Sequence, residues 1–237
     1  MRFDACAESY DAYAVPQRVF AERVAAFTGV LPRERVVEFG AGTGALTRHV
    51  CDSAQGQVLA TDASAAMVAL GRKAVSGVQW SQLDAFGGSV PASDLQLSSG
   101  LLQWADEPVR VLQLWRTALE PGGRMVHAFP CEPCLREWRA LVPAAPVRWR
   151  DEKAWCEVFR AAGLQPRRRQ TWIETIVFTS ALDMLRAMHR SGATGRARVG
   201  TGELRRALRD YEVRHRGPAG VLATWAWLAI EAVPGIG

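Results

Sequence analysis

A short strand-like run that leads directly into a glycine-rich loop constrains the fold of this chain more than any other feature. Val36–Phe39 is mostly apolar and begins with two β-branched residues, and Gly40, Gly42 and Gly44 follow it without a break. Glycine lets a backbone turn sharply and approach a ligand closely, and the N–H groups at the start of the next helix can bind that ligand. A strand, a glycine loop and a helix in this order predict an α/β sheet that binds a nucleotide-like cofactor.

Strand-like and helix-like segments alternate along the first half of the chain. The pattern predicts strands over residues 36–39, 57–61, 78–80, 94–98 and 124–129. It predicts helices over residues 44–53, 64–72 and 107–119. Ligands of such sheets bind beyond the carboxyl ends of the strands. We therefore predict an α/β fold with a doubly wound, mostly parallel, Rossmann-like sheet.

The remaining segments are expected to surround this core within a single domain, 1–237. Apolar side chains recur at helical spacing near the N-terminus, and prolines cluster after the last predicted core strand. The expected parts are an N-terminal helical lid, a cofactor-binding core, an inserted cap and a C-terminal part that completes the sheet, over 1–30, 31–130, 131–150 and 151–237. Elements of the last part are predicted over 152–162, 171–178, 180–190, 202–214 and 221–232.

Composition argues against several classes of protein. The chain has 237 residues, of which 49% are hydrophobic, yet it contains no apolar run of the length that a membrane span needs. Residues 1–6 lack the apolar core of a signal peptide, and five widely spaced cysteines suggest no disulfide framework, so we expect a cytoplasmic protein. Cys131 and Cys134 form a lone C-x-x-C without the further ligands of a zinc site, and no metal is expected.

Charge is distributed unevenly along the chain. Residues 1–130 carry a net charge of −2 and residues 131–237 a net charge of +7. A positive field attracts acidic partners, either an acidic protein or a nucleic acid, although a merely solvated arginine-rich surface would have the same composition. The arginines that could form a docking surface are Arg136, Arg139, Arg148, Arg150 and Arg167–Arg169.

The glycine loop alone is compatible with two cofactors. Gly40-x-Gly42-x-x-Ala45 satisfies the dinucleotide fingerprint, and Asp62 stands where an acidic residue meets ribose hydroxyls. A nicotinamide-dependent oxidoreductase is therefore one interpretation. However, Glu38 immediately before the loop would repel a pyrophosphate and attract a cationic ammonium group.

Two further features favour S-adenosylmethionine. Gly44 completes a G-x-G-x-G pattern, and Asp84 follows the third predicted strand. The arrangement resembles motif I of class I S-adenosylmethionine-dependent methyltransferases, which implies that Asp84 holds the adenine amino group. The cofactor-binding residues expected from this resemblance are Glu38, Gly40, Ala41, Gly42, Asp62, Ala63, Met67, Asp84, Ala85 and Ser99.

Four further segments carry a closer resemblance, and they follow one another along nearly the whole chain. They are Phe3-x-x-Cys6-Ala7-x-x-Tyr10-Asp11-x-x-Ala14-x-x-Gln17, Ser98–Trp104, Leu185–Ala193 and Ala223-Thr224-Trp225. Together they resemble the malonyl-acyl-carrier-protein O-methyltransferases of biotin synthesis. The resemblance implies methyl transfer from S-adenosylmethionine to the free carboxylate of a malonyl thioester. The implied partner is an acidic acyl carrier protein or coenzyme A, and neither a nucleic acid nor a membrane.

The same resemblance implies roles for individual side chains. Tyr10 corresponds to a tyrosine that hydrogen-bonds the substrate carboxylate, and Arg186 is the candidate anion clamp because its planar guanidinium suits a carboxylate. Candidate substrate-binding residues are Gln103, Trp104, His189 and Arg190. His189 departs from the lysine of many family members and is only partly charged near neutral pH. Another class I methyltransferase, acting on a small carboxylate, phenol or amine, and a non-catalytic binding protein are the alternatives.

Overall fold

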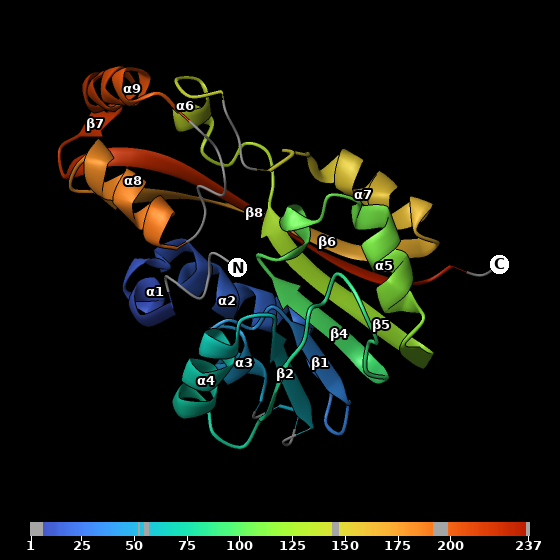
Figure 1. Ribbon diagram of the computed structural model, residues 1–237. Coiled ribbons are helices and arrows are strands. Elements are labelled where there is room, and N and C mark those ends of the chain that lie inside the picture. The colour runs from blue at the N-terminus through green and yellow to red at the C-terminus, as the bar shows by residue number, and fades with distance from the viewer. Residues whose placement is uncertain (1–6, 52, 55–56, 144–146, 192–198, 236–237) are drawn as a thin grey trace.

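The computed structural model describes residues 7–51, 53–54, 57–143, 147–191 and 199–235. Its sheet has the order β3-β2-β1-β4-β5-β8-β6, and β7 pairs with β8 (Figure 1). The strands are β1 Val36–Phe39, β2 Val58–Asp62, β3 Gln79–Gln82, β4 Ser93–Ser99, β5 Leu119–Pro130, β6 Leu164–Phe178, β7 Arg216–Gly217 and β8 Gly220–Pro234. Strands β1 to β5 are parallel, and among the described strands β8 alone runs in the opposite direction, with β5, β6 and β7 as its antiparallel partners. The predicted doubly wound, mostly parallel sheet is confirmed.

Helices cover both faces of this sheet (Figure 1). They are α1 Ala7–Tyr13, α2 Val15–Thr28, α3 Thr47–Val50, α4 Ala65–Ala74, α5 Pro108–Arg116, α6 Arg136–Arg139, α7 Glu152–Ala161, α8 Ala181–Arg190 and α9 Thr201–Arg214. On one face, Trp115 of α5 and Phe159 of α7 pack against His127 of β5. On the other face, Phe20 of α2 stacks on Trp227 of β8. None of these helices is both long and apolar enough to cross a bilayer, among the residues that the structure describes.

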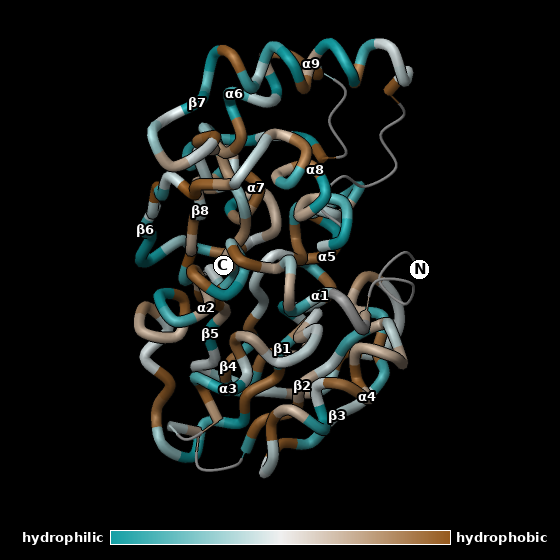
Figure 2. The backbone as a smooth tube through the Cα atoms, turned by 90° about the vertical axis from the view of Figure 1, so that its left-hand side faces the viewer, coloured by the Kyte–Doolittle hydropathy of each residue, from teal (hydrophilic) through white to brown (hydrophobic). Residues whose placement is uncertain are grey.

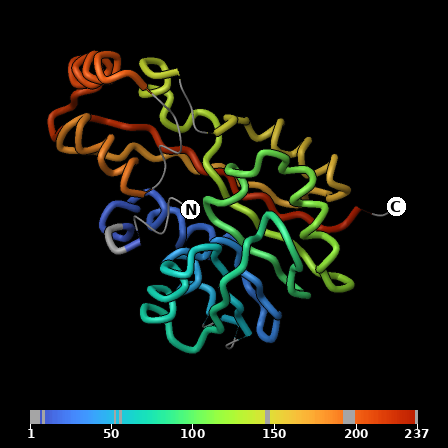
Figure 3. Tube along the Cα trace, in the orientation of Figure 1, coloured from blue at the N-terminus to red at the C-terminus, as the bar shows by residue number. Residues whose placement is uncertain are grey.

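The long pair β6 and β8 extends beyond the core sheet and carries the C-terminal helices. The hydroxyl of Tyr211 in α9 donates to the carbonyl of Leu222, and Glu137 of α6 accepts from the backbone N–H of Thr224. Figure 2 shows α8 between α9 and α1, and Figure 3 shows the N-terminal helices beside α8. The extension therefore brings the C-terminal part of the chain against the predicted lid.

Several predicted boundaries were wrong, each for a local reason. The N-terminal helical segment consists of two helices, because a new helix starts at Val15 with Pro16 in its first turn, where a missing N–H is tolerated. The helix predicted over 44–53 is reduced to Thr47–Val50. Strand β6 starts at Leu164 rather than at 171, because it pairs with β8 along its whole length. The polar run Arg167–Arg169 is tolerated in this strand because it is exposed to solvent. Phe3, Cys6, Gly192 and Ala193 of the family-like segments lie outside the described residues.

A buried histidine shows how completely the core excludes water. His127 is fully buried, its Nδ1 lies 2.9 Å from the Ser98 hydroxyl, and its ring contacts Trp115. Burial lowers the pKa of His127 to about 3. The imidazole is therefore neutral near pH 7 and serves packing rather than proton transfer.

Gly71 and Gly202 are both helical glycines, and alanine is expected to affect them in opposite directions. A Cβ on Gly71 of α4 would lie 2.2 Å from the buried indole of Trp80, whereas a Cβ on Gly202 of α9 would meet nothing within 4 Å. Gly71→Ala should therefore destabilise the fold by about 2–3 kcal/mol through overpacking. Gly202→Ala should stabilise it by about 0.5 kcal/mol because alanine is the better helix former. Urea denaturation measures both changes, and a stabilised Gly71→Ala variant would contradict the tight packing of α4 on β3.

Candidate functional site

The glycine loop lies at the carboxyl ends of β1 and β2, as predicted. Gly40, Gly42 and Gly44 have φ angles of +63°, +57° and +89°, a region that other L-residues rarely adopt. The N–H of Ala41 donates to the carbonyl of Thr61 at 2.8 Å, which ties the loop to β2. The glycines are therefore required by the backbone path itself.

Glu38, the last residue but one of β1, places a buried carboxyl group beneath this loop. Its side chain accepts a hydrogen bond from the Thr47 hydroxyl at 2.7 Å, and the residue is 2% exposed. Burial raises the pKa of Glu38 to about 7; the hydrogen bond from Thr47 opposes this rise, and the nearby Asp62 carboxylate adds to it. A cation bound beside Glu38 would therefore stabilise its ionised carboxylate, because the cation would replace the solvation that burial removes.

Asp62 ends β2 and faces the same loop. One carboxylate oxygen accepts from the N–H of Gly42 at 3.0 Å and the other from the N–H of Ser64 at 2.8 Å. The Ser64 hydroxyl in turn caps α4 by accepting from the N–H of Met67. Two carboxyl groups, on Glu38 and Asp62, therefore meet at one edge of the sheet.

These groups fit S-adenosylmethionine better than a dinucleotide. The site presents two carboxyl groups, which accept hydrogen bonds. They suit an ammonium group and ribose hydroxyls and would repel a pyrophosphate. A Cβ on Gly42 would project toward the ring of Tyr10, 4.0 Å away, so a side chain there would occupy the space between loop and lid. The two carboxyl groups and the shape of the loop therefore both favour S-adenosylmethionine.

The other predicted cofactor residues lie along the same edge. Ala63 follows β2, Met67 is buried in α4, and Ser99 ends β4. Asp84 is exposed after β3 and accepts from the N–H of Phe86, while the carbonyl of Ala85 accepts from the Trp115 indole at 2.7 Å. The carboxyl end of each strand from β1 to β4 thus leads into a predicted cofactor residue.

Helix α1 closes over the loop. Tyr10 is half-buried beside Gly42, and burial raises the pKa of its phenol, as do the carboxylates of Asp62 and Asp11. The Thr43 hydroxyl of the loop donates to the Asp11 carboxylate. The lid is therefore bonded to the cofactor loop, and Tyr10 keeps its hydroxyl proton as a donor.

Helix α8 approaches the lid from the other side. The guanidinium of Arg190 donates to the Tyr13 hydroxyl and lies 4.6 Å from the centre of that ring. Arg186 pairs with Asp183 of its own helix at 3.3 Å and is 58% exposed, and His189 is also exposed. The structure thus joins Arg190 to the lid, while the described contacts of Arg186 stay within α8.

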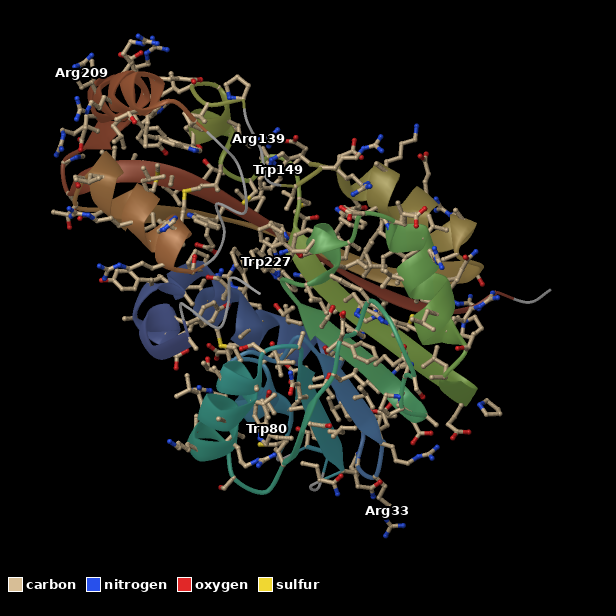
Figure 4. The ribbon with its side chains drawn as sticks, in the orientation of Figure 1. Arg33, Trp80, Arg139, Trp149, Arg209 and Trp227 are labelled. Carbon is tan, nitrogen blue, oxygen red and sulfur yellow. The ribbon has the colours of Figure 1, made fainter. Side chains whose placement is uncertain are left out.

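Gln103 and Trp104 lie in a short 3-10 helix, Leu102–Trp104, just after β4. The side-chain amide of Gln103 donates to the carbonyl of Gly100 at 2.7 Å, and Trp104 is half-buried. Sequence reasoning missed Trp227, which lies at the centre of the molecule beside Gly100 (Figure 4). In the sequence Trp227 belongs to a segment that looked like an ordinary closing strand, and its contact with Gly100 joins β8 to the loop after β4.

Several of the arginines expected to form a docking surface make contacts within the chain. The ion pairs are Arg136–Glu137, Arg139–Glu132, Arg168–Glu231 and Arg169–Glu152. Arg150 lies over the Trp155 ring. A guanidinium that already meets a carboxylate adds little to an external field.

The C-x-x-C pair is buried and its thiols are protonated. Burial raises the pKa of Cys131 and of Cys134 to about 12 each. Within the described ranges, no three His, Cys, Asp or Glu side chains are grouped so as to hold a metal ion.

Comparisons with known proteins match the part of the chain that contains this loop. A family described as "Methyltransferase domain" matches residues 37–125, which contain Glu38, the glycine loop and Asp62. The biotin biosynthesis bifunctional protein BioCD of Bordetella avium is 29% identical over 89% of this chain, which spans only 48% of that protein. The malonyl-[acyl-carrier protein] O-methyltransferase of Pseudescherichia vulneris is 27% identical over 81% of this chain and 78% of its own length. Residues 37–125 of this chain thus match a methyltransferase domain, and the chain resembles methyltransferases over most of its length.

Solved structures agree with this assignment at the level of the fold. A SAM-dependent methyltransferase of Thermotoga maritima superposes on the chain with a TM-score of 0.61, at 16% identity and 98% coverage of both chains. DhpI, solved as a complex with SAH, has a TM-score of 0.61, at 18% identity and with 99% of this chain and 94% of its own covered. These structures show the fold alone, whereas the match to a methyltransferase domain and the two carboxyl groups beside the glycine loop favour S-adenosylmethionine over a nicotinamide cofactor.

Proposed function

We propose that this methyltransferase esterifies the free carboxylate of a malonyl thioester, carried by acyl carrier protein or coenzyme A, in the cytoplasm. The observation that carries the proposal is the position of Tyr10, a protonated phenol that the lid holds against the cofactor loop. Relatives support a carboxylate acceptor: two bear the name malonyl-[acyl-carrier protein] O-methyltransferase, and a third is a trans-aconitate 2-methyltransferase, 30% identical over 63% of this chain.

In this proposal the edge of the sheet holds the cofactor by its polar groups. Glu38 pairs with the methionine ammonium, Asp62 accepts from the ribose hydroxyls, and Asp84 accepts from the adenine amino group. The loop backbone of Gly40–Gly42 and the side chains of Ala63, Met67, Ala85 and Ser99 complete the contacts. The bound cofactor supplies an electrophilic methyl group on a sulfonium.

The protein's own contribution is then alignment. A malonyl carboxylate is ionised near neutral pH, so the reaction needs no general base. Tyr10 donates a hydrogen bond that orients one carboxylate oxygen, and Gln103, Trp104, His189 and Arg190 line the acceptor site. Correct alignment of two reactants is worth up to about 7–11 kcal/mol in favourable cases.

The affinity for S-adenosylmethionine is expected to rise between about pH 5 and pH 7 and then to level off. Burial raises the pKa of Glu38 to about 7 in the free protein, so below that pH the carboxyl must lose a proton before it can pair with an ammonium group. The same shift gives the free protein stability that is complete below the unfolded pKa of about 4.5 and is lost as pH rises through about 7.

Calorimetric titration of the cofactor at several pH values measures this dependence. Glu38→Gln is the matched control, because it keeps the shape of the side chain but cannot ionise, and its affinity should be weaker and insensitive to pH. A wild-type affinity that stays constant from pH 5.5 to pH 7.5 would argue against a contact between Glu38 and the ammonium group.

Arg186→Ala is expected to reduce kcat/KM for the malonyl thioester by about tenfold, the effect of losing one charge-assisted hydrogen bond. Cofactor affinity should stay within about twofold, because no described contact links Arg186 to the glycine loop. Asp183→Asn is the control: it releases Arg186 from its ion pair at 3.3 Å and should preserve or raise turnover. Unchanged turnover in Arg186→Ala would place the anion clamp elsewhere.

Mass spectrometry tests the reaction itself. Malonyl-carrier protein and malonyl-coenzyme A are incubated separately with enzyme and S-adenosylmethionine, and acetyl-carrier protein serves as the control without a free carboxylate. The proposal expects one added methyl group on a malonyl thioester and none on the acetyl thioester. Methylation of trans-aconitate or a small phenol or amine instead of malonyl would favour the alternative class I activity.

A further inference from the structure

Two polar atoms beside the predicted acceptor site are buried without a hydrogen-bond partner among the described residues. One is the indole nitrogen of Trp227, a side chain that is 2% exposed. The other is the side-chain oxygen of Gln103, which is 8% exposed. A buried donor or acceptor that is left unpaired costs free energy, so such groups commonly mark a ligand or water that completes them.

Both side chains border the same glycine. Measured from the Cβ position of Gly100, Cζ2 of Trp227 lies at 3.4 Å and the amide nitrogen of Gln103 at 3.9 Å. Cζ2 is next to the carbon that bears the indole N–H, so the indole donor and the Gln103 amide belong to side chains that meet at Gly100. The φ of +76° at Gly100 makes this close approach possible.

Neighbouring residues hold both groups in position. The Trp227 ring stacks on Phe20 of α2, with ring centres 5.1 Å apart and planes 12° apart. The amide nitrogen of Gln103 donates to the carbonyl of Gly100, which leaves its oxygen as the unused end. Gly100 is therefore flanked by one fixed donor on Trp227 and one fixed acceptor on Gln103.

One donor next to one acceptor is complementary to a secondary amide. A carboxylate has only acceptors and would face repulsion from the Gln103 oxygen, whereas an amide accepts from the indole with its C=O and donates to Gln103 with its N–H. We propose that Trp227 and Gln103 bind the amide nearest the thioester in the arm that carries the acyl group. This inference rests on the proposed function, because it assumes an acyl thioester substrate.

The experiment compares two small substrates that differ in that amide. Malonyl-N-acetylcysteamine thioester has one amide, and malonyl ethyl thioester has none. Wild-type enzyme should prefer the first by about tenfold in kcat/KM, the effect of a well-placed pair of hydrogen bonds. Trp227→Phe, which keeps the stacking on Phe20 but lacks the N–H, and Gln103→Leu should each remove most of this preference.

Trp155→Phe is the matched control. Trp155 is also fully buried with an unpartnered indole nitrogen, but it packs on Phe129 and belongs to α7 on the opposite face of the sheet. The preference should be unchanged in this variant. If Trp227→Phe lowers the rates of both thioesters equally, Trp227 serves the carboxylate or the fold, and the amide proposal is overturned.

A binding measurement separates this inference from the reaction. The nine tryptophans are labelled with nitrogen-15, and the indole resonance of Trp227 is identified by its loss in Trp227→Phe. Acetyl-coenzyme A, which has the amide arm but no free carboxylate, should shift that resonance and leave that of Trp155 in place. An unshifted Trp227 resonance would overturn the inference even if malonyl is methylated. A shifted resonance without any methylation would contradict the proposed function alone.

Discussion

Replacing Asp62 with alanine is expected to weaken S-adenosylmethionine binding by about 100-fold, since two hydrogen bonds to a charged group are lost. In the free protein those bonds go to the N–H groups of Gly42 and Ser64, so the carboxylate also sets the path of the glycine loop. In the proposed complex Asp62 additionally accepts from the ribose. The substitution therefore removes a contact with the cofactor. It also removes the support of the glycine loop, which makes other contacts with the cofactor.

Calorimetry on wild-type and variant proteins measures this loss, and Asp94→Ala provides the comparison. Asp94 accepts from the Arg35 side chain at the opposite end of β1 and β4, where it cannot reach the cofactor loop. Its removal should leave the affinity within about twofold of the wild type. Equal affinities in wild type and Asp62→Ala would refute the role of Asp62.

Arg124→Met is expected to destabilise the fold by about 3–5 kcal/mol, because it leaves the largely buried carboxylate of Glu34 without its cation and Glu231 with Arg168 alone. Arg124 of β5 is 15% exposed and pairs with Glu34 at 3.1 Å and Glu231 at 3.4 Å. It also donates to the carbonyls of Thr28 and Gly29 at the end of α2. One guanidinium thus joins α2, β5 and β8, three elements that are far apart in sequence.

Arg110→Met is the control for this loss, and urea denaturation measures both variants. Arg110 forms an ion pair with Glu107 at 3.5 Å, and both side chains are more than 70% exposed. Such a pair contributes at most about 1 kcal/mol. Similar stabilities for the two variants would show that the Arg124 network is not what holds α2 to the sheet.

The features that sequence reasoning predicted correctly are those with a local physical cause. The glycine pattern of Gly40–Gly44 follows from backbone sterics, and the alternation of strands and helices follows from hydrophobic periodicity within short windows. These predicted the sheet and the cofactor loop. The reduced helix after Gly44 and the early start of β6 were missed because pairing with β8 and packing on neighbouring elements override local preference.

The candidate acceptor site shows the same contrast between features with a local cause and features set by tertiary packing. Tyr10 was named from the sequence, but its position against Gly42 depends on α1 folding back over the loop. Arg190 was predicted to bind substrate. In the structure it donates a hydrogen bond to Tyr13, which lies 177 residues earlier in the chain. Three of the seven arginines expected to dock a partner are paired with carboxylates that no sequence spacing relates to them.

The sequence by itself determined the doubly wound sheet and the S-adenosylmethionine loop, because strand periodicity, glycine conformation and the charge of Glu38 act over a few residues. Only the tertiary structure decided which side chains surround the proposed acceptor site. Trp227, Gly100 and Phe20 come from three distant elements, and their contact depends on the order of β4, β5 and β8 in the sheet. Such contacts arise from the packing of whole elements, for which a single sequence contains no local signal.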